Sequence, residues 1–143
     1  MWYNCNRQFA KDYTMERYTY NKELIEKLNI KYFIEKYNLD NDKYNLAIFY
    51  ALSSVYEHNY RVEKKVATKN ILFGDYYSFV YYSLLKSDLD KLVLLTNVMK
   101  EGYLGLIKST LDVNSFNKRI IMQWLDFYDL TFDEKDSQAL ISL

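Results

Sequence analysis

Residues that could catalyse a reaction are few in this sequence, and most catalytic constellations lack a required member. His58 is the only histidine and Cys5 the only cysteine, so a histidine-rich metal site, a cysteine-based zinc site and an intramolecular disulfide are excluded. A Ser-His-Asp or Cys-His arrangement could use only His58, which lies in a helical pattern with no nucleophile elbow nearby. No glycine-rich phosphate loop is present. We therefore do not expect His58 to be catalytic.

Paired carboxylates near the end of the chain are the next candidates. Asp126 and Asp129 are three residues apart, and Asp133 and Asp136 repeat the spacing. On a helix this spacing places two carboxylates on one face, where they could hold a weakly bound cation such as Mg²⁺. We expect instead a solvated acidic face beside a buried Trp124.

The composition indicates the elements that must position such residues. The chain has 143 residues, of which 50% are hydrophobic and 27% charged, with three glycines and no proline. Folds built from many short strands use glycine and proline at their turns, so this chain is unlikely to be one of them. Its length suits one domain spanning residues 1–143. We predict an all-α fold, a single bundle of about six or seven helices joined by short connections.

The charge balance bears on partners and location. Lys and Arg number 19, as do Asp and Glu, so the net charge is zero. This argues against nucleic acid as a partner, because phosphate binding needs a concentrated basic surface. It is compatible with a protein partner. Residues 1–10 lack the apolar run of a signal peptide, and no stretch is apolar enough for a membrane span, so we expect a cytoplasmic location.

Apolar spacing predicts the order of helices. It indicates helices over residues 14–37, 43–62 and 65–86, the last apolar nearly all round in its second half and therefore expected to be buried on several sides. Ser87 and Asp90 resemble a capping box that opens a fourth helix, in which Gly102 and Gly105 loosen the pattern. A plausible cap at residues 112–114 opens the next helix. Thr131 and Glu134 could cap a short terminal one.

Gly74 and Asp75 interrupt the third predicted helix at its middle. A glycine there costs roughly 1 kcal/mol relative to alanine, and a carboxylate among aromatic residues needs a partner. We infer that Gly74 admits a crossing helix, and that Asp75 accepts a hydrogen bond from a hydroxyl or pairs with a cation. The aromatic run from Tyr76 to Tyr82 points around the whole circumference, so one face would be buried and another left for a partner or apolar ligand.

These residues resemble a known motif. The segment GDYYSFVYYSLL, which includes Gly74, Asp75, Tyr76 and Tyr77, is similar to the AxLxGD[FY]LxxxA helix of trans-prenyl diphosphate synthases. Its double-tyrosine form resembles the small subunit of bacterial heterodimeric hexaprenyl and heptaprenyl diphosphate synthases. The match is specific over about twenty residues. The resemblance implies a shortened isoprenoid-synthase-like helical fold.

The resemblance also implies that this chain is non-catalytic. Catalytic relatives carry a DDxxD motif upstream of this helix, where it binds magnesium and the allylic diphosphate. The corresponding stretch here contains Tyr56, Glu57 and His58, and no aspartate occurs between residues 50 and 64. Magnesium is then expected on a catalytic large subunit, with no cofactor bound by this chain. Together the two subunits would add isopentenyl diphosphate to farnesyl diphosphate, giving a long prenyl chain of the kind used in menaquinone.

The contribution of the small subunit would come from the same helix. Ser78, Tyr81, Tyr82 and Leu85 are candidates for contact with the partner or the growing prenyl chain, although each tyrosine could equally fill this domain's own core. A different interpretation is a helical adaptor unrelated to isoprenoids, which the neutral charge and scarce catalytic residues also favour. The sequence does not distinguish six isoprene units in the product from seven.

Overall fold

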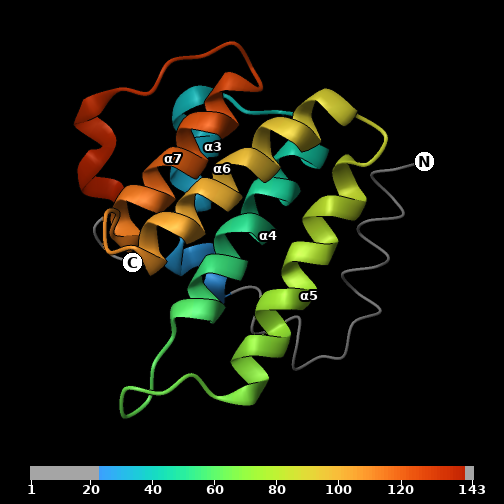
Figure 1. Cartoon of the computed structure of the whole chain (residues 1–143). Helices are drawn as coiled ribbons and strands as arrows, with labels where there is room; N and C mark the ends of the chain where they lie inside the picture. The colour runs from blue at the N-terminus through green and yellow to red at the C-terminus, as the bar shows by residue number, and fades with distance from the viewer. Residues whose placement is uncertain (1–22, 141–143) are drawn as a thin grey trace.

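Helix α4 (Asp42–Asn59) is the centre of the fold (Figure 1). In the computed structural model, which describes residues 23–140, nine consecutive residues of α4, 47–55, are buried. Small side chains at Ala47, Ala51 and Ser54 allow neighbouring helices to approach it closely. We expected the second half of residues 65–86 to be buried on several sides. In the structure Tyr77, Tyr81 and Leu85 are buried there, whereas Phe79 and Tyr82 stay exposed, and α4 rather than this helix takes the central place.

The remaining elements surround α4. They are α3 (Ile30–Tyr37), α5 (Thr68–Leu85), α6 (Leu89–Ile107), α7 (Val113–Asp126) and the 3-10 helix η1 (Glu134–Leu140). Figure 1 shows α5 along one side of α4, with α6 and α7 towards the other. Residues 23–140 contain no strand, only an isolated bridge between Val62 and Lys65. The predicted all-α bundle is confirmed.

A buried asparagine joins α4 to α7. The Oδ1 atom of Asn45 accepts hydrogen bonds from Trp124 Nε1 at 2.9 Å and from Tyr128 Oη at 2.6 Å. Its Nδ2 donates to the carbonyl of Leu39 at 3.1 Å. Burial raises the pKa of Tyr128 to about 12, so its hydroxyl remains a donor. Every polar atom of this amide therefore has a partner, and α4 and α7 are held in one register.

Helix boundaries follow local hydrogen bonding more closely than apolar spacing. The predicted helix 14–37 is broken at Asn29, whose φ of 59° is left-handed. Residues 23–27 are helical before this break, and α3 begins directly after it; residues 14–22 lie outside the described range. Ser87 does not cap α6, because the N-cap position is Asp88. The cap expected at residues 112–114 is confirmed: Asp112 accepts a hydrogen bond from the Ser115 amide at 2.7 Å.

Glycine is used inside helices rather than in turns. All three glycines of the chain lie in helices and none has a positive φ. A Cβ atom on Gly102 would lie 2.2 Å from Cε1 of Phe116, so this glycine lets α6 meet α7 closely instead of loosening the helix. Left-handed positions are taken by other residues, namely Asn29, Asn38, Glu63, Lys64, Ser109 and Asp129.

Candidate functional site

Gly74, the glycine of the family-like motif, lies against the side chain of His58. A Cβ atom built on Gly74 would be 2.3 Å from His58 Cδ2 and 2.4 Å from Nε2. Such distances are far below van der Waals contact, so any larger residue at position 74 would displace the imidazole. The crossing helix inferred from the sequence is α4, and its histidine fills the space that the glycine leaves.

A chain of hydrogen bonds continues from this contact. It joins Asp75 and Ser78 of α5, Ser54 and His58 of α4, and Tyr103 of α6. His58 Nε2 lies 3.0 Å from Asp75 Oδ1, and His58 Nδ1 lies 2.8 Å from Tyr103 Oη. Ser54 Oγ then lies 3.2 Å from Tyr103 Oη and 2.7 Å from Ser78 Oγ. Three helices therefore share one continuous polar network, which we call the interhelical network.

The donors and acceptors of the interhelical network can be assigned from its ends. A carboxylate only accepts, so we assign the Nε2 proton of His58 to the bond with Asp75; in that neutral tautomer Nδ1 accepts from the hydroxyl of Tyr103. Burial raises the pKa of Tyr103 to about 12, which keeps this hydroxyl protonated. Both imidazole nitrogens are thus occupied. In this arrangement His58 holds helices together and has no free lone pair for a metal or substrate.

Glu57 forms a second polar contact between α4 and α5. Its side chain is fully buried, and Oε1 accepts a hydrogen bond from Asn70 Nδ2 at 3.0 Å. Asn70 is itself only 5% exposed in the first turn of α5. Tyr56, on the neighbouring face, accepts a hydrogen bond from Lys27 Nζ at 2.8 Å. Tyr56, Glu57 and His58 therefore each contact other residues of this chain.

The other motif residues divide between core and surface. Tyr77 is 2% exposed and Tyr76 is partly buried. Tyr81 and Leu85, two of the predicted partner contacts, are buried in this chain's own core. Tyr82 is 53% exposed. Of the two adjacent tyrosines at positions 81 and 82, the second is therefore the one that is exposed at the surface.

The terminal carboxylates differ from the solvated face that we expected. Asp126 and Asp129 are exposed, but Asp136 is 1% exposed. Asp136 accepts hydrogen bonds from Lys36 Nζ at 2.6 Å, from Tyr32 Oη at 2.6 Å, and from the hydroxyl of Tyr37. The expectation is wrong for Asp136 because three donors of α3 surround it.

Residues 23–140 hold no candidate metal site and no candidate membrane span. Within that range, no three His, Cys, Asp or Glu side chains come close enough together to hold a metal ion. None of its helices combines the length and hydropathy that crossing a bilayer requires.

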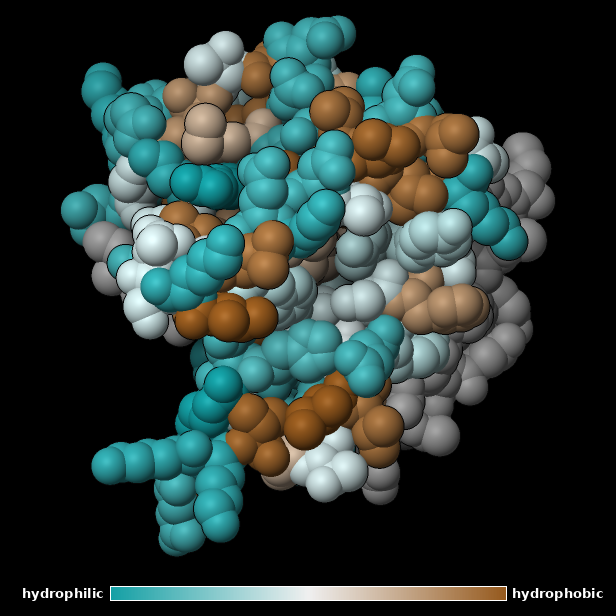
Figure 2. All heavy atoms as spheres, in the orientation of Figure 1, coloured by the Kyte–Doolittle hydropathy of each residue, from teal (hydrophilic) through white to brown (hydrophobic). Residues whose placement is uncertain are grey.

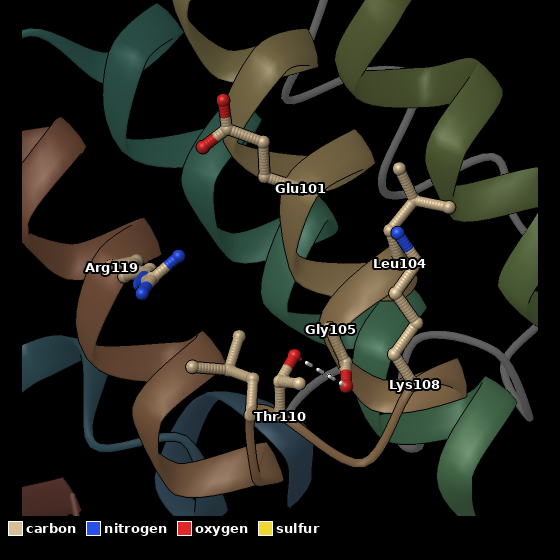
Figure 3. A pocket seen from close by; sticks show the side chains of 7 residues that line it. Glu101, Leu104, Gly105, Lys108, Thr110 and Arg119 are labelled. Atoms are coloured by element: carbon tan, nitrogen blue, oxygen red, sulfur yellow. Dashed lines mark hydrogen bonds between the residues drawn. The ribbon is translucent and has the colours of Figure 1, made fainter.

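A pocket of about 230 Å³ lies between α6 and α7 (Figure 3). Its polar lining comes from Glu101, Lys108, Thr110 and Arg119, and Figure 3 shows the Glu101 and Arg119 side chains on opposite sides. One carboxylate offsets part of the charge of the two cations. The Thr110 hydroxyl bonds to the Gly105 carbonyl at 3.4 Å. The lining selects no particular ligand, and we assign none.

Sequence reasoning found Gly74 and Asp75 but missed Ser54, Asn70 and Tyr103. A helix-interior glycine beside a carboxylate indicated a close contact, whereas the partner positions depend on how α4 and α6 cross α5. Comparison with protein-family models, with curated proteins and with solved structures finds no match to this chain.

Proposed function

We propose that this chain is the small, non-catalytic subunit of a heterodimeric hexaprenyl or heptaprenyl diphosphate synthase. With a catalytic large subunit it would extend farnesyl diphosphate by consecutive addition of isopentenyl diphosphate, and so supply the side chain of a quinone. The observation that carries the proposal is the pairing of α5 with α4. The family-like Gly74–Asp75 pair contacts His58, in the stretch that corresponds to the Asp-rich motif of catalytic relatives.

The chemistry of this pairing supports a non-catalytic role. Ionising an allylic diphosphate through magnesium needs two opposed carboxylate clusters that are open to the substrate. Here Glu57 is buried against Asn70, and both nitrogens of His58 are hydrogen-bonded. The proposal therefore assigns magnesium and the diphosphate groups to the large subunit. It places the complex in the cytoplasm, where Cys5 would remain reduced.

The motif helix limits what the small subunit can offer its partner. Phe79 and Tyr82 expose 66% and 53% of their surface, whereas Tyr77 and Tyr81 face the core. Exposed aromatic rings on a helix supply large apolar contact area at low entropic cost. We infer that Tyr82, rather than Tyr81, contacts the large subunit or the growing prenyl chain.

A reconstitution assay tests the proposal. The chain is mixed with a synthase large subunit from the same organism that carries two Asp-rich motifs, and incubated with farnesyl diphosphate, isopentenyl diphosphate and magnesium. We expect neither subunit to form product alone, and the mixture to form a long prenyl diphosphate. A large subunit that makes the same product alone would contradict the proposal. If the chain is instead a helical adaptor, adding it would not change the product of the large subunit.

Product length in the same assay tests the assignment of Tyr82. Tyr82→Ala should shift the chain-length distribution or weaken assembly of the two subunits. Tyr60→Ala is the matched control, since Tyr60 is 42% exposed but lies in the α4–α5 connection. Equal behaviour of the two variants would remove Tyr82 from the proposal and leave the reconstitution result standing.

A further inference from the structure

Helix α5, together with its C-cap Lys86, presents a regular stripe of exposed side chains to solvent. The stripe, which we call the outer stripe, consists of Leu72, Asp75, Phe79, Tyr82 and Lys86. Its spacing alternates between three and four residues, which is the pattern that packs one helix against another. Leu72 and Phe79 are 62% and 66% exposed, values that a packed helix rarely leaves to water.

The outer stripe has apolar neighbours beyond its own helix. Leu89, 65% exposed, and Val93, 50% exposed, lie in the first turns of α6, next to the end of α5. Figure 2 shows apolar surface over the region where α5 joins α6, and again over the first turns of α5. Paler surface, with some apolar surface among it, lies between the two patches. A surface with apolar groups at both ends can be matched by the same surface in reverse orientation.

We propose that the outer stripe is the docking surface for a second copy of this chain, with the two α5 helices antiparallel. In a two-fold interface each contact occurs twice: if residue i of one copy contacts residue j of the other, residue j of the first copy also contacts residue i of the second. The register that sets Asp75 opposite the second copy's Lys86 also sets Phe79 opposite Tyr82. Both charge pairs are then complementary and both aromatic pairs stack. The outer stripe is therefore complementary to itself.

The geometry at Asp75 leaves room for this pairing. His58 takes Oδ1, and the Asp75 side chain remains 67% exposed. The second oxygen can accept from a lysine while the interhelical network stays intact. The half-exposed or more exposed apolar side chains of the outer stripe and its neighbours are five, namely Leu72, Phe79, Tyr82, Leu89 and Val93, against roughly 20–30 residues a side in a standard interface. We therefore expect a weak, reversible dimer.

Absence of net charge favours the same association. With 19 basic and 19 acidic residues, two copies have no overall repulsion to overcome. The proposal concerns the chain by itself and does not rest on the proposed function. It predicts self-association in buffer without any large subunit or substrate, so its failure and the failure of the reconstitution assay are separate outcomes.

Sedimentation of the full chain over about 1–100 µM provides the test, with a charge exchange to fix the register. The wild-type chain should become dimeric over this range. Asp75→Lys and Lys86→Glu each place like charges opposite one another twice, and each should weaken dimerisation at least about tenfold. An equimolar mixture of the two variants restores both pairs and should dimerise. Lys100→Glu, an equal charge change on the exposed side of α6, should behave as the wild type.

Each contrary result overturns one part of the dimer proposal. A monomeric wild-type chain at 100 µM removes the second copy as occupant of the outer stripe. A dimer that Lys86→Glu leaves unchanged places the contact elsewhere. A mixture that stays monomeric rejects the antiparallel register. Because Asp75→Lys also removes the partner of His58, circular dichroism checks its fold, and Tyr82→Glu provides a second variant that should weaken the dimer without touching the interhelical network.

Discussion

The contact between Gly74 and His58 makes each residue depend on the other: position 74 must lack a side chain for the imidazole to fit. The imidazole occupies the volume where a Cβ atom would be, and two hydrogen bonds prevent it from turning away. A change at either residue therefore acts on the other. This coupling can be measured as an interaction free energy in a double-mutant cycle.

We expect Gly74→Ala to lower the free energy of unfolding by about 2 kcal/mol, although alanine is the better helix former by about 1 kcal/mol. The loss arises because the methyl group displaces His58 from both Asp75 and Tyr103. Urea denaturation measures the change. In a His58→Ala background the obstacle is gone, so the same substitution should raise stability by about 1 kcal/mol. Equal effects in both backgrounds would show that the contact carries no energy.

The amino-acid sequence indicates one half of this contact. A glycine and an aspartate in the middle of an apolar helix are costly unless something packs there, so Gly74 and Asp75 could be singled out. Tyr103 could not, because it is separated by 45 residues from His58 and sits on a helix whose crossing angle the sequence does not state. Spacing along one helix is readable, and contacts between helices depend on how they cross.

Among the elements, η1 is linked to α3 through a buried carboxylate. Asp136 is buried between α3 and η1, where Lys36, Tyr32 and Tyr37 bond to its carboxylate. Burial by itself would raise the pKa of Asp136, but the hydrogen bonds from Lys36, Tyr32 and Tyr37 outweigh it, and the pKa is lowered. The ionised carboxylate of Asp136 therefore holds η1 against α3.

We expect Asp136→Asn to lower the free energy of unfolding by about 2 kcal/mol at neutral pH, since hydrogen bonds to a charged group contribute about 1.5–3 kcal/mol. Hydrogen exchange should become faster over residues 134–140. The lowered pKa means that the stabilisation is full above the unfolded value of about 3.9 and is lost as the pH falls through the folded pKa. The gap between wild type and variant should therefore narrow below about pH 4.

Asp129→Asn is the control for this prediction. Asp129 is exposed and has a left-handed φ of 58°, which asparagine also adopts readily. Its stability should change by less than about 0.5 kcal/mol at any pH. A gap between Asp136→Asn and wild type that stays constant from pH 7 to pH 3 would contradict the role of the ionised carboxylate.

Element order was predictable from apolar spacing, but the role of each element was not. Helix α5 carries the stronger apolar run, yet α4 is central because Ala47, Ala51 and Ser54 leave space on several sides. Aromatic α5 lies along it and keeps Phe79 and Tyr82 outside. Small residues mark the position of closest approach more reliably than total hydrophobicity does, because interiors are limited by packing as well as by transfer from water.

At the scale of the whole molecule, the described chain places its polar chemistry inside and its unpartnered apolar groups outside. Glu57, His58 and Asp136 hold helices to one another, whereas Leu72 and Phe79 face solvent. A surface of this kind is suited to association, with a large subunit as proposed or with a second copy. Both proposals draw on α5, so a large subunit that binds there would compete with self-association.

The placement of glycine has a consequence for how this protein can change. Its turns are formed by residues such as Glu63 and Lys64, at φ of 53° and 68°, a region where an L-residue costs about 1–2 kcal/mol. Lys64→Gly should therefore raise the free energy of unfolding by about 0.5–1 kcal/mol after glycine's own entropy cost. Lys100→Gly, in the exposed interior of α6, should lower it by about 1 kcal/mol. Urea denaturation of both variants decides the matter.

If the two variants differ in this way, substitutions in the loops can raise the free energy of unfolding without any change in the core. Single substitutions at the left-handed positions could do so without moving a helix. A protein with such turns can tolerate destabilising changes elsewhere, on the exposed side of α5 for example, and a later substitution in a turn can offset them. New contacts would then arise on the exposed side of α5, whereas the substitutions that compensate for their cost would lie in the turns.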